Sequence, residues 1–183
     1  EKPLPEIVED EKPFEIPEGW IFTRLEDLVS KNIKRGKSPR YTTYSGILVF
    51  AQKCNAKTGV IDMGLAQYLD ESTISKYPEE EFMRYLDIIV NSTGNGTLGR
   101  VGLFHESDNP TKHRIVPDSH VAIIRMNSHM LPDYAYYFLK RCQPYFESLG
   151  SGSTNQTELN PQALRELIVP LPPLAEQKRI VAK

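Results

Sequence analysis

Short runs of β-branched and apolar residues, separated by polar stretches that contain glycine, asparagine or proline, extend from Trp20 to Met126. Such runs are typical of β-strands. They predict strands at residues 20–23, 47–51, 60–63, 87–91, 100–104 and 121–126, with a short helical turn at 25–30. The polar and basic residues 31–46 predict a loop, and the acidic residues 77–85 receive no assignment.

Helical spacing replaces this pattern towards the end of the chain. Apolar residues recur every three or four positions between Leu131 and Leu149, and Pro132 suits a first helical turn. A helix is therefore predicted from Pro132 to about Phe146. A second helix is predicted to begin at Asn160-Pro161, where a capping residue precedes a proline.

The last predicted helix covers residues 174–183 and follows a short strand at 167–169 and the rigid segment 170–173. A helix of this length is only marginally stable alone. Its apolar flank is therefore expected to contact a partner protein through Leu174, Gln177, Ile180 and Val181.

Together these elements indicate an α/β (α+β) fold, in which a curved mixed β-sheet has peripheral helices and long polar loops on one face. The 183 residues suit one domain, and the composition is that of an ordinary globular protein. No apolar run approaches the roughly 20 residues that span a bilayer. The segment Glu1–Pro5 contains no apolar signal core, so we expect no membrane partner and a cytoplasmic location.

Charge is distributed unevenly along the chain. Residues 1–18 contain seven acids, two lysines and four prolines, which predicts an extended acidic arm. The remaining residues carry 20 bases and 17 acids, a modest excess that suits nucleic-acid binding without requiring it. We therefore divide the chain into the arm (1–18), a main domain (19–172) and a terminal helix (173–183).

The spacing of reactive residues does not favour catalysis or metal binding. Cys54 and Cys142 form no metal-type pair, and reduced thiols are favoured over a disulfide, which the sequence leaves open. The histidines lack metal-ligand spacing. The adjacent residues Asp118-Ser119-His120 do not resemble a hydrolase triad, which is built from distant positions. We expect no catalytic residue, no metal and no cofactor.

A glycine-rich stretch, Ser92–Gly102, follows one of the predicted strands. Gly94, Gly96 and Gly99 have the spacing of a dinucleotide-binding fingerprint, but that motif must open a helix and here a strand is predicted to follow. The kinase pattern fails because Ile124 stands where a lysine is required. The stretch instead predicts a tight hairpin. Its glycines are either purely structural or bring a backbone close to a phosphate, with donors from Asn95, Thr97 and Arg100.

Three polar stretches are candidates for DNA contact, although each is equally compatible with a solvated loop. Residues 31–40 contain five cations and no acid. Arginine matches the O6 and N7 acceptors of guanine, whereas lysine more often positions the DNA backbone. The candidates are Lys31, Lys34, Arg35, Lys37, Arg40 and Tyr41 in the first stretch, Lys53, Asn55 and Lys57 in the second, and Lys112, His113 and Arg114 in the third.

Several motifs, taken jointly and in order, resemble the specificity subunits of Type I restriction-modification systems. They cover nearly the whole chain: Gly19-Trp20, Leu25-x-Asp27-Leu28, Asp87-Ile88-Ile89 leading into Thr93–Arg100, Ser119-His120, the turn at 148–153 with Thr154-Asn155-Gln156, and the closing Ile168–Leu174 followed by Glu176-Gln177-x-x-Ile180-Val181.

The resemblance implies a non-enzymatic protein that reads double-stranded DNA. A specificity subunit has two recognition domains, each reading one half of a split target, and helical spacers that dock the adenine methyltransferase subunits and, through them, the restriction subunit. This chain would supply one such recognition domain (19–172) and the beginning of a spacer helix (173–183), without the second domain. The resemblance adds Thr93, Thr154 and Asn155 to the candidate DNA contacts.

Two alternatives remain open at this stage. One is a protein-interaction module that uses the arm and the last helix. The other, less favoured, is a nucleotide-binding enzyme domain that uses the Gly94–Gly99 loop.

Overall fold

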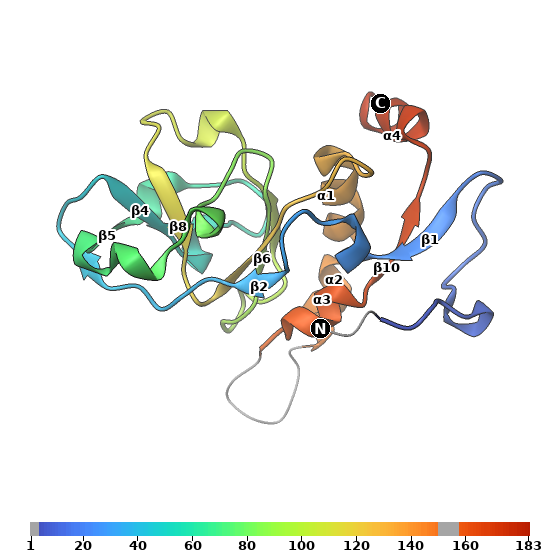
Figure 1. The fold of residues 1–183 in the computed structure, drawn as a ribbon, viewed down its shortest axis with the longest axis horizontal. Helices are drawn as coiled ribbons and strands as arrows, with labels where there is room; N and C mark the ends of the chain where they lie inside the picture. Colours follow the sequence, from blue (N-terminus) through green and yellow to red (C-terminus); the bar gives the residue numbers. More distant parts are fainter. Residues whose placement is uncertain (1–3, 150–157) are drawn as a thin grey trace.

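The computed structural model describes residues 4–149 and 158–183. Two four-stranded sheets lie side by side, helices cover the inner sheet, and a two-stranded ribbon projects from the opposite side (Figure 1). The α+β class is confirmed. The strands that the sequence assigns to one sheet are divided between these separate sheets.

The inner sheet is antiparallel throughout and has the strand order β2 (Lys34–Arg35), β9 (Val121–Ile124), β6 (Ile88–Asn91) and β7 (Val101–Leu103). Every residue of β6, β7 and β9 is buried, which explains their apolar sequences. One face of this sheet packs against the helices and the other against the outer sheet, so apolar side chains are required on both faces.

The outer sheet has the order β3 (Tyr41–Thr42), β5 (Gln67–Leu69), β4 (Ile47–Phe50) and β8 (Arg114–Pro117). Strands β4 and β8 are parallel, with Ile47 opposite Arg114 and Phe50 opposite Pro117. Both strands therefore end at the same edge of the sheet, and the loops that follow them lie close together.

The predicted strand at 60–63 is wrong. Ile61 forms only an isolated bridge with Asn55, and Met63 already begins a 3-10 turn that ends at Leu65. Four strands arise where none is predicted, namely β2 and β3 inside the expected loop and β5 and β8 further along the chain. Each contains too few apolar residues to give a recognisable strand pattern.

The predicted helix from Pro132 to Phe146 is interrupted. It forms as α1 (Pro132–Arg141) and α2 (Gln143–Leu149), with Cys142 between them. Pro144 has no N–H to donate to the carbonyl of Lys140, which explains the break. The helix predicted at Asn160-Pro161 begins there as α3 (Pro161–Arg165), with the Asn160 side chain accepting a hydrogen bond from the Gln162 N–H at 2.9 Å.

The projecting ribbon pairs β1 (Ile21–Arg24) with β10 (Ile168–Leu171) and leads directly into α4 (Leu174–Val181) (Figure 1). Ile180 and Val181 pack against the main hydrophobic core, whereas Leu174 is exposed. Among the described residues no helix is long and apolar enough to cross a membrane.

Gln177 fastens α4 to the body of the domain. Its side chain is fully buried; Nε2 donates to the carbonyls of His129 and Pro172, and Oε1 accepts from the Leu131 N–H at 2.8 Å. The sequence predicts that Gln177 contacts a partner protein. In the structure its amide is instead buried and hydrogen-bonded within the fold, so it is not available to a partner.

Replacing Gln177 with leucine should destabilise α4, because the His129 and Pro172 carbonyls and the Leu131 N–H lose their partner. Unsatisfied groups of this kind cost about 1–3 kcal/mol. Hydrogen exchange should become faster in residues 174–181 while β6 and β9 stay protected. The exposed neighbour Lys178 is the control, since Lys178→Ala should leave α4 exchange unchanged; equal acceleration in both variants would contradict this role.

Candidate nucleic-acid interface

The glycine-rich residues connect β6 to β7 as a closed and well-packed hairpin loop. Gly94, Gly96 and Gly99 all have positive φ, at 103°, 73° and 76°. A side chain on Gly94 would meet the Thr97 hydroxyl at 2.2 Å, and one on Gly99 would meet the backbone of α2 at 2.8 Å. The glycines are therefore needed for packing within the protein. Because β7 follows the loop, no helix N-terminus is present to hold a pyrophosphate.

The base of this loop is held by a network of buried polar side chains. Asn55 Nδ2 donates to Asn91 Oδ1 at 3.2 Å and to the Arg100 carbonyl at 3.0 Å. The Arg100 guanidinium donates to the carbonyls of Asn55 and Gly96 at 3.2 and 2.8 Å. Asn55 is fully buried, so it holds the loop in place and is not exposed for the predicted DNA contact. The Arg100 guanidinium likewise binds carbonyls within the protein, one of them in the glycine-rich loop itself.

Substituting Gly99 with alanine should lower the free energy of unfolding more than the same change at Gly96. Both positions have positive φ, which costs an alanine about 1–2 kcal/mol. Only Gly99 adds a clash with α2, worth about 1–3 kcal/mol more, since nothing lies within 4 Å of a side chain on Gly96. Urea unfolding of the two variants measures this difference. Equal losses would show that the close packing of Gly99 contributes nothing.

The loops at the ends of β4 and β8 meet this hairpin. His120, in the turn between β8 and β9, places Nδ1 2.5 Å from the Thr93 hydroxyl, and its carbonyl accepts from the Ser92 N–H at 2.8 Å. Thr93 also contacts Gln52, which directly follows β4. The ring of His120 remains exposed to solvent. Its backbone is fixed by buried Asp118, whose Oδ1 accepts the His120 N–H at 2.8 Å.

The segment that follows β2 crosses this turn at very short range. A side chain on Gly36 would lie 2.1 Å from the carbonyl oxygen of Pro117, so only glycine fits there. Further along, the Ser38 and Ser119 hydroxyls are 3.4 Å apart. Arg35 forms an ion pair with the side chain of Glu158 at 3.1 Å. The backbone of Glu158 in turn forms an isolated antiparallel β-bridge with Thr93.

These contacts bring four segments that are distant in the sequence together at one edge of the two sheets. We call the result the junction surface, and its exposed or half-exposed members are Arg35, Ser38, Lys53, Asn95, Ser119 and His120. This surface therefore presents two cations, an amide, two hydroxyls and an imidazole, and the contacts described above hold its segments together. Arginine, asparagine and serine can read base edges, and lysine can contact a phosphate.

The three lysines of the first basic stretch converge on one buried carboxylate instead. Glu81 is 3% exposed and lies 2.5 Å from Lys34, 3.8 Å from Lys31 and 4.0 Å from Lys37. The Lys31 side chain is itself buried, and this burial lowers its pKa. Lys31 is therefore not exposed for the predicted DNA contact, whereas Lys34 and Lys37 remain partly accessible.

The remaining predicted residues are spread over other parts of the surface. Arg40 pairs with Asp70 at 3.2 Å beside the outer sheet, where Tyr41 is 43% exposed on β3. Lys57 and Lys112 are exposed. Thr97 donates its hydroxyl to the Thr93 carbonyl. Thr154 and Asn155 lie outside the described residues.

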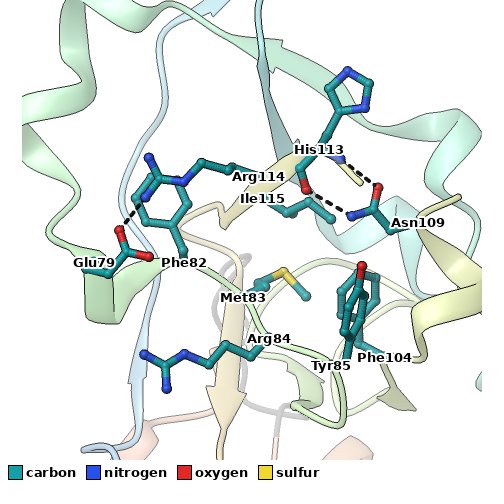
Figure 2. A pocket seen from close by; sticks show the side chains of 10 residues that line it. All are labelled: Glu79, Phe82, Met83, Arg84, Tyr85, Phe104, Asn109, His113, Arg114 and Ile115. Carbon is teal, nitrogen blue, oxygen red and sulfur yellow. Dashed lines mark hydrogen bonds and ion pairs between the residues drawn. The ribbon is translucent and has the colours of Figure 1, made fainter. Parts of the chain in front are cut away.

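His113 and Arg114 line a hollow of about 280 Å³ at the opposite end of β8 from the junction surface (Figure 2). The Arg114 guanidinium lies 3.6 Å from the centre of the Phe82 ring and pairs with Glu79. The Asn109 side chain closes the loop beside the hollow: its Nδ2 donates to the His113 carbonyl, and its Oδ1 accepts from the His113 N–H. Both predicted residues thus have partners within the protein, away from the hairpin loop.

The structure brings together only part of the predicted set, with Arg35, Lys53, Thr93 and Asn95 at the junction surface. The candidate DNA contacts chosen from the sequence do not include Ser38, Ser119 or His120. The adjacent Ser119-His120 before a buried strand was the one signal that could have marked this turn. No cluster of three or more metal-binding side chains occurs in residues 4–149 and 158–183.

Comparison with known proteins places this arrangement in a family. Residues 17–183 match the family described as Type I restriction modification DNA specificity domain. The chain is 26% identical over 192 residues to the specificity subunit of the Type I restriction enzyme EcoAI, and 26% identical over 195 residues to that of EcoEI, both from Escherichia coli. All of this chain is covered in both cases but only 31% of either relative, so it spans about a third of their length.

Solved structures show the same fold. The HsdS subunit from Thermoanaerobacter tengcongensis superimposes with a TM-score of 0.67 at 20% identity, over 93% of this chain and 37% of that one. A Type I restriction-modification S subunit from M. genitalium gives a TM-score of 0.59 at 18% identity, over 92% and 39%. The chain therefore belongs to the family of Type I restriction-modification DNA specificity domains.

Proposed function

We propose that this domain binds double-stranded DNA and reads one half of a bipartite target through the junction surface. It would direct the adenine methyltransferase and restriction subunits of a Type I complex, which would supply all of the chemistry. The observation that carries the proposal is the convergence of exposed polar side chains from four segments on one rigid edge, within a chain of this family.

The division of labour within the junction surface follows from its chemistry. Lys53 and the exposed backbone around Gly96 would contact phosphates, which fixes the position of the domain on the duplex. Asn95 and His120 would read base edges, and Arg35 would exchange Glu158 for a guanine or a phosphate. That exchange costs little because the ion pair is partly exposed on both sides.

Titration of the chain with duplex DNA over a range of salt concentrations tests the proposal. The apparent affinity should fall steeply, with a log–log slope of about −0.9 for each phosphate contacted. Binding by a single domain should be weak, because the avidity of two linked recognition domains is absent. A salt-independent signal, or no binding even within an assembled complex, would overturn the proposed function.

The identity of the target can be obtained independently. Mapping methylated adenines in the genome of the source strain should reveal a split motif, one half of which is assigned to this domain. Selection of duplexes from a randomised pool by the chain should then enrich that same half. Enrichment of an unrelated sequence would contradict the assignment.

The nucleotide-binding alternative receives no support from the geometry, because side chains fill the space beside Gly94 and α2, chiefly its backbone, fills the space beside Gly99. A thermal-shift screen with nucleotides would detect a true site, since ligands that bind only the folded state raise its stability.

A further inference from the structure

A second surface lies at the other side of the molecule, where the arm (residues 4–18) runs beside the outer side of the β1–β10 ribbon (Figure 1). A hollow of about 740 Å³ separates the arm from β1. Its apolar lining includes Phe14, Ile16, Trp20, Ile21 and Phe22. We call this hollow the arm groove.

The arm is held in place by specific contacts. Arg24 is 7% exposed and donates Nε to the Pro5 carbonyl at 3.3 Å and a terminal nitrogen to Glu11 Oε1 at 3.0 Å. The hydrogen bond from the Val8 N–H and, next in size, the hydrogen bond from Arg24 lower the pKa of Glu11. Both interactions favour the ionised form of this carboxylate. The rings of Phe14 and Phe22 meet edge to face with their centres 5.5 Å apart. These contacts keep both walls of the groove in position.

Apolar side chains remain exposed around the groove. Two of the lining side chains, Ile21 and Phe14, are 58% and 51% exposed. Scattered exposed apolar residues are ordinary, but contiguous ones at a hollow mark interaction sites. The ribbon beneath has only two strands, so it also offers unpaired edges.

The arm, which forms one wall of the groove, carries negative charge that the protein only partly neutralises, and of its acids Glu9 and Glu15 line the groove itself. Residues 4–18 contain six carboxylates and one lysine. Lys12 pairs with Glu9, and Arg24 with Glu11. Within the described residues, the other four carboxylates have no cationic partner: Glu6, Asp10, Glu15 and Glu18.

We propose that the arm groove binds a segment of a partner protein that carries lysine or arginine next to apolar side chains. The apolar lining, the unpaired Glu15 within it and the acidic arm that carries it are complementary to such a segment. The same charge disfavours DNA, whose phosphates would be repelled. A symmetric pair of this chain would bring the two acidic arms against each other, so a second copy is also disfavoured. The domain would therefore bind a protein at the arm groove and DNA at the junction surface, on different sides of the molecule.

Trp20 provides a direct readout, because it lines the groove and is the single tryptophan of the sequence. The probe is a short synthetic peptide in which lysine alternates with valine, and the matched control peptide has glutamate in place of lysine. The lysine peptide should change Trp20 emission saturably. The glutamate peptide and duplex DNA should have no effect at the same concentrations.

Two variants separate the contributions of charge and apolar contact. Ile21→Asp should weaken the peptide at least about tenfold, since an isoleucine contact is lost. Glu15→Lys should weaken it about two- to fivefold, as expected for one exposed ion pair. Both side chains are exposed, so the fold should be retained, which a thermal melt checks.

Matched controls on another surface are Leu65→Asp and Glu79→Lys, which should leave peptide binding unchanged. The proposal is overturned by an unchanged Trp20 signal, by equal responses to both peptides or to DNA, or by binding that survives Ile21→Asp and Glu15→Lys. These outcomes do not depend on the junction surface, so failure here leaves the proposed function standing.

Discussion

Replacing Asp87 with alanine should lower the free energy of unfolding by about 3–5 kcal/mol, the range observed when one partner of a buried ion pair is removed. Asp87 is 1% exposed and immediately precedes β6. Its two carboxylate oxygens accept from Nε and a terminal nitrogen of Arg125, each at 2.7 Å. One of them also accepts the Arg84 N–H at 2.8 Å.

The size of the effect follows from what remains after the substitution. The Arg125 side chain is 13% exposed and also donates to the Phe82 carbonyl at 2.9 Å, so it cannot simply turn into water. An unpaired guanidinium would stay near the core, between the start of β6 and the end of β9. Such a loss is a large fraction of the 5–15 kcal/mol that keeps a typical domain folded.

Urea unfolding of wild type and variant measures this loss, and the chain offers a matched control. Glu79 and Arg114 form the same type of pair at the surface, with side chains 77% and 50% exposed. Glu79→Ala should therefore cost less than about 1 kcal/mol. Converting both core partners, as Asp87→Leu with Arg125→Met, should recover much of the loss. A small cost for Asp87→Ala, comparable to that of Glu79→Ala, would contradict the analysis.

Three strands of the inner sheet, β6, β7 and β9, could be predicted because both of their faces are buried, so β6 and β9 are almost entirely apolar. The short strands β2, β3, β5 and β8 could not, because the backbone pairing that creates them is set by strands elsewhere in the chain. In the same way, the apolar periodicity predicted one helix up to Phe146, whereas the single missing N–H of Pro144 divides it.

The candidate site was harder to predict than the fold, for an electrostatic reason. Residues 31–40 contain cations and no acid, which suggests a surface open to DNA. Glu81, Asp70 and Glu158 neutralise much of this charge, and each is distant in the sequence. Local charge patterns therefore overstate how many cations are available, and only the assembled fold distinguishes Arg35 from the buried Lys31.

Removing Asn95 and His120 together should abolish the preference of the domain for its target half-site while leaving most non-specific DNA binding intact. Each side chain that reads a base edge contributes about 1–3 kcal/mol of discrimination. Lys53→Ala should act differently, because a phosphate contact weakens binding to all sequences alike and reduces the salt slope by about 1. Competition titrations with matched and scrambled duplexes separate the two effects.

The substitutions are suited to this test because the three residues are exposed, and among the contacts that join the segments they remove that of the His120 ring with the Thr93 hydroxyl. The loop is held by Asn55, Asn91 and Arg100, and the turn by Asp118. Lys178→Ala on α4 is the matched control for charge and should change neither affinity nor slope. If the Asn95→Ala, His120→Ala double variant kept full discrimination, base reading would have to be assigned to another surface, even if the domain still bound DNA with a steep salt dependence.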